Sequence, residues 1–348
     1  MSMIYNSSMN LNEQEFNSQI LQNPDGGNVF QSVEFAKIKQ SQGWTPRYEN
    51  VGDIAVTILE KSVFGLGKLW YIPKGPGVAV SAELNDILPE LKNIAQKAGV
   101  FMVKIEPEIA KTDETLADLQ KMNLKKVRPI QPNFATVLID LTPEIDEIMK
   151  NLNQKGRHAI RRAERDGVTV ERVDTTDDNC RAMYNLLAET AAGSFGIRKY
   201  DYYRDFWQKF AADSMGQLFF AYVEGKIVAG AFALIFGAKS TYKDGASTRE
   251  RTVYGASHLL QWEVIKWAHE NGSRLHDLCG APPSDQIKNL DHPHYGIGRF
   301  KTSFNKTVTD YVGAYDLVVE TLPYKIWQKV GERAALRLHH RLHHESFY

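Results

Sequence analysis

Hydrophobic and polar residues follow a rhythm of short helices and strands that occurs twice along the chain. In the first half, Ala82–Ala98 has apolar residues at helical spacing, and a buried strand, Gly99–Ile105, follows it. Two segments with strand-like alternation, Tyr48–Glu60 and Lys68–Ile72, and a short helix, Glu34–Lys39, come before. We predict each of these five segments as a single element, and their order along the chain is helix, strand, strand, helix, strand.

The second half repeats this order. Leu218–Val223 and Lys226–Phe236 are β-rich runs joined by Glu224-Gly225, which favours a hairpin. After the hairpin we predict the strand Thr241–Ala246, the helix Tyr254–Glu270 and the strand Arg274–Leu278. Before the hairpin we predict two helices, Asp178–Ala192 and Tyr202–Ala212. Hairpin, strand, helix, strand is the order of an acetyltransferase (GNAT)-like core. We therefore predict an α/β (α+β) fold of two fused GNAT-like domains, each a twisted mixed sheet flanked by helices.

The length of 348 residues suits two domains of ordinary size. We predict the boundary near Leu141, where the strand Ala135–Leu141 meets Thr142-Pro143-Glu144. The first domain is then 1–141 and the second 142–314. The C-terminal segment 315–348 is expected to return to the first domain and complete it.

Charge and cysteine content narrow the compartment and the partners. Lys+Arg and Asp+Glu both number 42, so a nucleic-acid contact has to come from a local patch. The two cysteines, Cys180 and Cys279, form no disulfide framework. The polar N-terminus has no apolar stretch of a secretory signal, and no run of about 18 apolar residues occurs. We expect a cytoplasmic protein that meets any lipid-linked substrate at the inner face of the membrane.

The clearest basic element is Lys155–Arg172. Arg157, Arg161 and Arg165 share one helical face, with Arg162 beside them. A solvated helix face and a ladder of cations for a phosphate backbone explain this pattern about equally well.

The segment Gly298–Lys306 carries the pair Phe300-Lys301 late in the second half. This pair, with Asn153–Ala163 at the start of the second domain, resembles the FemA/FemB/FemX (FemABX) family of aminoacyl-tRNA-dependent peptidoglycan aminoacyltransferases. The likeness is greatest to FemX-like members that lack the coiled-coil arm. It implies an enzyme that moves an amino acid from aminoacyl-tRNA to a stem-peptide amine of a peptidoglycan precursor, which builds interpeptide bridges in the cell wall.

The same resemblance implies partners and catalytic residues. The partners are aminoacyl-tRNA, used as co-substrate without any cofactor, and a UDP-linked or lipid-linked muramyl-pentapeptide, bound by a monomer. Lys301 and Phe300 would act at the aminoacyl end, with the ammonium of Lys301 balancing charge on the ribose or the tetrahedral oxyanion. The alternative is an amphipathic helix with Phe300 and Phe304 buried and Lys301 exposed. Glu106, at the end of a strand, matches an acidic position expected to accept a proton or hold the amine.

Substrate and tRNA ligands are implied in the same way. Lys37 and Arg198 would hold the diphosphate of the muramyl substrate, because a pyrophosphate needs charge-assisted donors from different elements. Tyr242 and Tyr254, beside Asp244, would hold the stem peptide, although core packing is the commoner fate of a strand tyrosine. The three arginines expected to hold tRNA are Arg157, Arg161 and Arg162. Without the resemblance, Lys37 and Arg198 would be interpreted as surface charge.

Three other patterns do not support a site. His276 and Cys279 invite a Cys-His-Asp interpretation with Asp277, but strand alternation turns His276 away from Cys279. Histidines that suggest zinc have no third ligand at suitable spacing, so we expect no metal: His292, His294 and the tail pairs His339/His343 and His340/His344. Arg251–Ala256 echoes the acetyltransferase pyrophosphate loop, but Tyr254 stands where its first glycine should be.

Two other functions remain open. One is a CoA-dependent N-acyltransferase on the same doubled fold, against which Tyr254 argues. The other is a catalytically silent module that binds cell-wall precursor, against which the arginine ladder argues. The tail Tyr324–His344 is basic and amphipathic, which suits an anionic membrane or tRNA, but a terminal helix that docks on the first domain is the simpler account.

Overall fold

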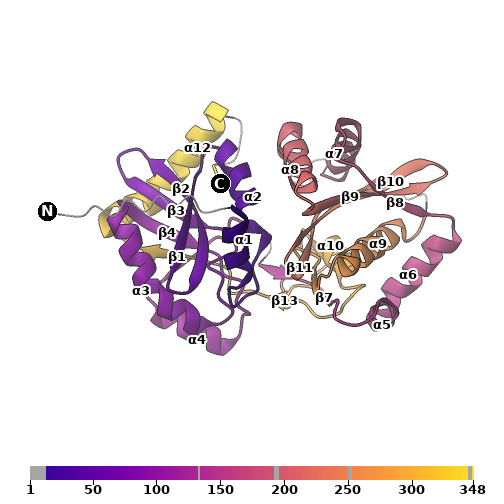
Figure 1. Cartoon of the computed structure of the whole chain (residues 1–348), viewed down its shortest axis with the longest axis horizontal. Helices are drawn as coiled ribbons and strands as arrows, with labels where there is room; N and C mark the ends of the chain where they lie inside the picture. Colours follow the sequence, from indigo (N-terminus) through magenta and orange to yellow (C-terminus); the bar gives the residue numbers. More distant parts are fainter. Residues whose placement is uncertain (1–12, 132–133, 192–195, 250–252, 344–346) are drawn as a thin grey trace.

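Two six-stranded mixed sheets, one in each half of the molecule, form its framework in this computed structural model (Figure 1). The structure describes residues 13–131, 134–191, 196–249, 253–343 and 347–348. The two sheets have matching topology. In each, an antiparallel hairpin leads to a parallel pair whose strands are joined by a helix, which is the order that the sequence predicts. The chain therefore has the predicted α/β architecture of two GNAT-like halves.

The first sheet has the strand order β1-β2-β3-β4-β14-β5. Its strands are β1 (Thr45–Val51), β2 (Ile54–Val63), β3 (Gly67–Ile72), β4 (Val100–Ile105), β14 (Ala314–Val318) and β5 (Lys125–Val127). The helices of this half are α1 (Glu13–Leu21), the 3-10 turn η1 (Val29–Gln31), α2 (Val33–Ser41), α3 (Ser81–Lys97) and α4 (Asp113–Lys121). Strand β14 comes from the C-terminal part of the chain and pairs with both β4 and β5. It is followed by α11 (Thr321–Ile326), a π-helical turn, η2 (Trp327–Gly331), and α12 (Glu332–His343).

The second sheet has the strand order β7-β12-β11-β10-β9-β8. Its strands are β7 (Leu138–Asp140), β12 (Leu275–Asp277), β11 (Lys239–Ser247), β10 (Lys226–Phe236), β9 (Gly216–Val223) and β8 (Thr169–Val173). The helices are α5 (Ile145–Asn151), α6 (Gln154–Arg165), α7 (Asp177–Ala191), α8 (Tyr200–Ala212), α9 (Ala256–Glu270) and α10 (Tyr295–Lys301). Two short strands, β6 (Ala135–Thr136) and β13 (Thr309–Asp310), pair with each other between the sheets.

Two segments that the sequence presents as single strands are each divided. Tyr48–Glu60 forms parts of β1 and β2, joined by a two-residue turn that begins at Gly52. Gly52 has φ +58°, which a hairpin turn of this kind requires at its first central position. Ala135–Leu141 forms β6 and β7, and β7 pairs with β12 of the second sheet. The chain therefore joins the second sheet at Leu138, the first residue of β7.

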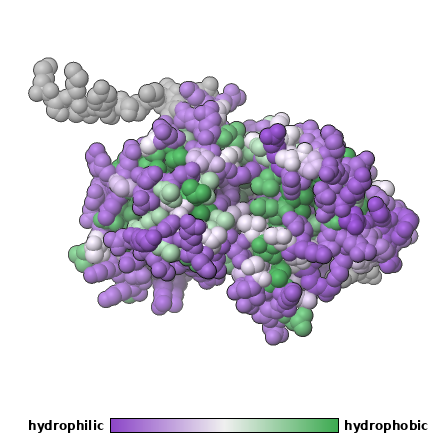
Figure 2. All heavy atoms as spheres, turned by 90° about the horizontal axis from the view of Figure 1, so that it is seen from below, coloured by the Kyte–Doolittle hydropathy of each residue, from purple (hydrophilic) through white to green (hydrophobic). Residues whose placement is uncertain are grey.

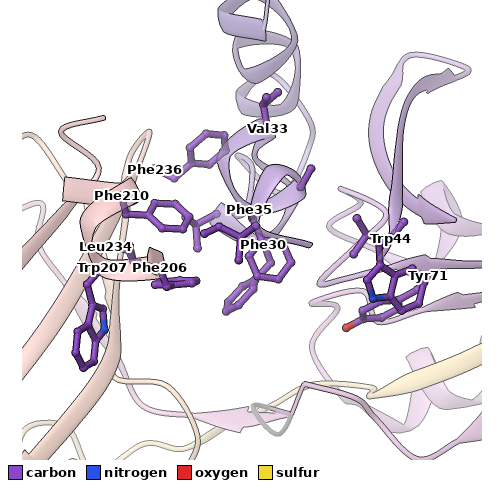
Figure 3. Close-up of a cluster of buried hydrophobic side chains, with 14 of the residues drawn as sticks. Phe30, Val33, Phe35, Trp44, Tyr71, Phe206, Trp207, Phe210, Leu234 and Phe236 are labelled. Atoms are coloured by element: carbon purple, nitrogen blue, oxygen red, sulfur yellow. The ribbon is translucent and has the colours of Figure 1, made fainter. Parts of the chain in front are cut away.

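One hydrophobic cluster includes side chains from both halves. Phe30 and Phe35, from η1 and α2, lie between aromatic residues of the second half, such as Phe206, and Trp44 and Tyr71 of the first (Figure 3). All five are buried, and the rings of Phe30 and Phe35 meet edge to face, with centroids 5.0 Å apart. Apolar residues also gather toward the middle of the molecular surface seen from below, between hydrophilic flanks (Figure 2). The segment formed by η1 and α2 therefore joins the two halves into one packed body.

Helix α6 is attached to the turn that follows α10. The backbone N–H of Asn153 donates to the Phe304 carbonyl at 2.8 Å, and its side-chain amide donates to the Thr302 carbonyl at 3.0 Å. The N–H of Gly156 donates to the Ser303 carbonyl at 3.1 Å. Orphan donors at the start of α6 are thus satisfied by the chain just beyond Lys301.

We expect a substitution at Gly156 to weaken this junction. A Cβ at residue 156 would lie 2.4 Å from the Ser303 carbonyl oxygen, so Gly156→Ala should lower the free energy of unfolding by about 1–3 kcal/mol. Gly296→Ala, in α10, is the matched control, because a Cβ there meets nothing within 4 Å. The control should be neutral or stabilising by up to about 1 kcal/mol. Chemical denaturation measures both, and equal effects of the two substitutions would contradict the packing described.

Candidate active site

Two carboxylates from different halves of the molecule meet in a small pocket between the sheets. Glu108 follows β4 of the first half, and Asp277 ends β12 of the second. The pocket is also lined by Asn28, Lys239 and Tyr311. Each carboxylate lies just beyond the C-terminal end of a strand of a parallel pair, which is where α/β sheets hold their ligands.

Each carboxylate is fixed by partners of its own. The ammonium of Lys74 lies 3.1 Å from one Glu108 oxygen, and the side-chain amide of Asn28 donates to the other at 2.8 Å. Asp277 accepts from the backbone N–H of Cys279 at 2.7 Å and from the hydroxyl of Thr136. Lys74 and Glu108 are almost completely buried, so this is an ion pair held away from water.

Burial and neighbouring charges push the two acids in opposite directions. Burial alone would raise the pKa of Glu108. The positive charges of Lys74 and Lys239 outweigh this effect, so the pKa of Glu108 lies below its usual range. Burial, together with the charge of Glu108, raises the pKa of Asp277. Divergent carboxyl pKa values within one pocket are typical of acid–base sites.

Lys301 lies beside Asp277, at the end of α10, and is buried, with 8% of its surface exposed. Its ammonium donates to the Gly280 carbonyl at 2.7 Å and to the Cys279 carbonyl. Burial lowers the pKa of Lys301 to about 8. The backbone of Cys279 therefore links Asp277 to Lys301, because its N–H donates to Asp277 and its carbonyl accepts from Lys301. The alternative of an exposed Lys301 on an amphipathic helix is wrong.

Phe300 packs against the ring of His258, with centroids 4.9 Å apart, and against Phe304, at 5.4 Å. His258 also contacts the hydroxyl of Ser303, at 3.0 Å from its Nε2. Burial lowers the pKa of His258 to about 4, so this ring is neutral at physiological pH. The aromatic group fixes the turn that carries Lys301.

A second group of charges lies where α2 faces the second half. Lys39 of α2 is buried, and its pKa is lowered to about 7 by burial and by the charges of Arg198, Lys61 and Lys243. These four cations, the cation cluster, come from α2, β2, the segment before α8, and β11. Lys243 is also paired with Asp244 at 3.0 Å. Because like charges that converge from separate elements cost free energy, the excess of positive charge around Lys39 favours the binding of an anion.

Main-chain oxygen atoms already lie against the cation cluster. Arg198 donates to the Tyr348 carbonyl oxygen at 2.9 Å, and Lys61 donates to the Phe347 carbonyl at 2.8 Å. The ring of Tyr348 lies parallel to that of Trp44, with centroids 6.2 Å apart. The C-terminus therefore lies beside α2 (Figure 1).

The two predicted diphosphate ligands have different surroundings. Lys37 is 38% exposed and forms an ion pair with Glu13 at 2.5 Å, whereas the charge of Arg198 acts on Lys39. Lys39, two residues further along, occupies the inward position. Helical spacing indicates this inward position, because residues three and four apart share a helix face. Lys39 follows the buried Phe35 by four residues and the buried Ala36 by three.

Glu106, predicted to accept a proton or hold the amine, lies two positions before Glu108 and has hydrogen-bond partners of its own. Its carboxylate accepts from the Tyr71 hydroxyl at 2.7 Å, from the Gln131 N–H at 3.2 Å and from the Ile130 N–H. Burial raises the pKa of Glu106. Both of its oxygens thus accept from the 130–131 segment. Glu106 lines a second small pocket with Lys74 and Tyr311, whereas Glu108 lines the pocket that it shares with Asp277.

The two predicted tyrosines lie in different places. Tyr242 is partly buried, and its hydroxyl covers Gly245, where a Cβ would meet it at 1.8 Å. Burial raises the pKa of Tyr242 above its usual range. Tyr254 is 51% exposed and lies under the guanidinium of Arg162, 5.1 Å from its ring centroid. Tyr254 therefore belongs to the α6 surface and is remote from the cation cluster.

The three predicted tRNA arginines differ in their surroundings. Arg157 donates to the Lys150 carbonyl at 2.6 Å and to that of Leu152, so it closes the end of α5. Arg162 forms a 3.3 Å ion pair with Asp166, and Arg161 is exposed. The face of α6 open to a phosphate backbone thus includes Arg161, and Arg165 follows it on the same face.

The patterns set aside in the sequence form no site in the described residues. His276 is buried between Ser240 and Gln261, at 2.7 Å from each, and so takes no part in a triad with Cys279. Among the residues the structure describes, no three metal-ligating side chains gather in one place. Arg251, Thr252 and His344 lie outside the described residues. No helix of the described ranges is long and apolar enough to cross a bilayer.

Known proteins share this architecture and, over part of the chain, its sequence. Residues 11–126 match the FemAB family model, and residues 150–289 match the acetyltransferase (GNAT) domain model. Lipid II:glycine glycyltransferases of Staphylococcus aureus strains MRSA252 and USA300 are 22% identical over 410 aligned positions, covering 93% of this chain and 96% of theirs.

Solved structures agree on the fold. A crystal structure of FemX has a TM-score of 0.77 at 21% identity and covers 93% of this chain and 99% of its own. The structure of L-PGS from Bacillus licheniformis has a TM-score of 0.51 at 15% identity, covering 91% and 96%. With the FemAB family model matching the first half, an acetyltransferase domain model matching the second, and glycyltransferases aligned over nearly its whole length, the chain is similar to the FemABX transferases.

Proposed function

We propose that this protein transfers an amino acid from aminoacyl-tRNA to an amine of the stem peptide of a muramyl-pentapeptide precursor. The amine nitrogen attacks the ester carbonyl carbon, the new C–N bond forms, and the C–O bond to the tRNA ribose breaks. The amine loses a proton and the ribose hydroxyl gains one, so the exchange balances without a cofactor. The lipid II acceptor in the names of the S. aureus relatives supports a lipid-linked precursor.

The observation that carries the proposal is the pocket to which both halves contribute. Glu108 and Asp277 face it from opposite sheets, and Lys301 is one peptide away from Asp277. An amide-forming site needs a group that accepts a proton from the amine and a cation for the developing oxyanion. This arrangement supplies the proton acceptor in the pocket and the cation beside it, joined through the backbone of Cys279.

Asp277 is the group we assign to the amine. Its raised pKa makes it a better proton acceptor than an ordinary carboxylate, while ionised Glu108 and Lys74 keep the pocket electrically balanced. Lys301 is assigned to the oxyanion. Two of the three N–H groups of its ammonium are directed to carbonyls, which fixes the direction of the third.

The cation cluster is the site we assign to the diphosphate of the acceptor. Lys39, Lys61 and Lys243 provide point charges, and Arg198 provides a bidentate fork. Because burial and the other three cations lower the pKa of Lys39, a bound dianion would restore its proton and its charge. The oxygens of residues 347–348 show that Arg198 and Lys61 reach acceptors here.

Helix α6 supports tRNA as the donor. Its exposed arginines lie on the helix whose first turn is hydrogen-bonded to residues 302–304, next to Lys301. A phosphate backbone along α6 would therefore lead toward α10. One experiment can distinguish aminoacyl-tRNA from acetyl-CoA as the donor.

The direct test incubates the purified protein with charged total tRNA and either nucleotide-linked or lipid-linked muramyl-pentapeptide. Mass spectrometry should show the acceptor gain one or more aminoacyl residues, and only when charged tRNA is present. Acetyl-CoA replaces charged tRNA in a parallel reaction. Acetylated acceptor in that reaction would establish the CoA-dependent function, and precursor binding without transfer in either reaction would establish the silent module.

A pair of lysine substitutions separates the two candidates for the diphosphate. Lys39→Met should weaken binding of nucleotide-linked muramyl-pentapeptide roughly tenfold to a hundredfold, as expected for the loss of a charged hydrogen-bond donor. Lys37→Met, on the same helix, should leave the affinity within about twofold. Calorimetric titration measures both. Normal binding by Lys39→Met with weakened binding by Lys37→Met would return the role to Lys37.

The pH profile tests Lys301. Its cationic form is present below a pKa of about 8 and is lost above it, so kcat should fall as the pH rises through about 8. Lys301→Arg keeps its charge, so the fall should move to higher pH in this variant even where its maximal rate is reduced. On the acidic side, kcat should rise with pH as Asp277 ionises. A descending limb that Lys301→Arg leaves unmoved would exclude Lys301 as its origin.

A further inference from the structure

The helical stretch from α11 to α12 presents a row of exposed apolar side chains to solvent. Its members repeat every fourth residue: Leu322, Ile326, Val330, Ala334, Leu338 and Leu342. Leu322 is 70% exposed and Leu342 is 66% exposed. Apolar side chains gathered on one face at this exposure differ from the scattered ones that ordinary surfaces carry.

A row of cations runs directly beside the apolar row. It also repeats every fourth residue, one position before each apolar residue from 326 onward: Lys325, Lys329, Arg333, Arg337 and Arg341. All five are exposed, and Glu332 is the one acidic residue between 321 and 343. Glu332 accepts from the Tyr348 hydroxyl at 2.9 Å, so it is turned toward the body of the protein. The outer face is therefore uniformly positive beside its apolar row.

A third row attaches the helix to the first half. Trp327 is buried against Phe101, with centroids 5.8 Å apart, and the Tyr324 hydroxyl donates to Asp316 at 3.1 Å. The terminal helix thus docks on the first domain, as the simpler account of the tail expects. Docking leaves the apolar and cationic rows on the outside.

The π-helical turn Trp327–Gly331 keeps these rows in line. In an α-helix, residues four apart are displaced by about 40° around the axis, so a row with this spacing gradually winds around the helix. A π turn has more residues per turn, so the same step there rotates the opposite way and offsets the drift. The apolar and cationic rows consequently share one outward side across the junction of α11 and α12.

The turn between β2 and β3 adds an apolar residue next to this face. Phe64, at its tip, is fully exposed. Leu66 of the same turn lies by the π-helical turn, since a Cβ at Gly331 would be 3.4 Å from its Cδ1. The yellow C-terminal helix and the β2–β3 strands lie on the same side of the first half (Figure 1).

We propose that this face, formed by residues 322–342 and Phe64, docks on an anionic lipid bilayer, with the helix lying in the plane of the interface. The cations match anionic headgroups, and the apolar row beside them matches the acyl boundary. A nucleic acid would leave the apolar row exposed to water, and a second copy of the face would oppose cation to cation. The inference goes beyond the proposed chemistry, since the face is separate from the pocket and binds lipid whatever the acceptor.

The test is sedimentation of the full chain with vesicles of phosphatidylcholine, with or without about one third phosphatidylglycerol. The protein should pellet with the anionic vesicles and far less with the neutral ones. Lys325→Gln/Lys329→Gln/Arg333→Gln should weaken this binding on the order of a hundredfold at low salt, with a smaller difference at high salt. Lys92→Gln/Lys97→Gln/Lys121→Gln, on α3 and α4, removes equal charge elsewhere and should have little effect.

A second variant tests the apolar row. Val330→Ser/Leu338→Ser/Leu342→Ser should weaken vesicle binding at low and high salt alike, because the lost interaction is not screened. Both variants should turn over nucleotide-linked precursor like the wild type, so loss of membrane binding stays distinct from failure of the proposed reaction. The proposal is overturned by wild-type protein that does not pellet, by equal binding to neutral vesicles, or by a cation variant that loses tRNA affinity while keeping its vesicle affinity.

Discussion

The packing of η1 and α2 between the two sheets is the constraint on which the site depends. Phe30 and Phe35 share one hydrophobic cluster with Phe206 and other aromatic residues of the second half (Figure 3). Gln31 fixes the same segment to the first half, donating to the Pro73 carbonyl at 2.7 Å and accepting from the Thr57 N–H at 2.9 Å. Because the candidate catalytic groups come from both halves, their separation is set by this packing and by no single domain.

The charges held between the halves argue for function more strongly than for stability. Removing Lys74, Glu108 and Asp277 from water costs free energy that their attraction offsets only in part, and apolar replacements of such groups are often neutral or stabilising. In the cation cluster, burial and the neighbouring like charges lower the pKa of Lys39, which costs free energy on folding, although Lys243 is paired with Asp244 at 3.0 Å. Both groups of charges lie at the junction of the sheets, where a substrate that spans the two halves would meet them.

Two of the predicted site residues, Lys37 and Glu106, each lie two positions before a residue that the structure places at the junction of the halves. Lys37 and Lys39 are both lysines in one resembling segment, and only the phase of α2 decides which of them turns inward. Glu106 and Glu108 flank Pro107 beyond β4, where strand alternation no longer applies. Resemblance located the segments, but the direction of a side chain is a property of the local backbone and of what packs against it.

Periodicity and turn residues were enough to predict the repeated order of elements and the two GNAT-like sheets, because both act over a few neighbours. The resemblance placed candidate segments around Lys301 and Arg198, and these roles stay predictions. The sequence also indicated the amphipathic tail and the failure of a triad at His276, since both follow from helix and strand geometry. Only the tertiary structure decided that Lys39 replaces Lys37 beside Arg198, that Asp277 and Glu108 share a pocket, and that the tail leaves two rows outward. Those contacts join residues more than a hundred positions apart, and they arise from packing that no local pattern encodes.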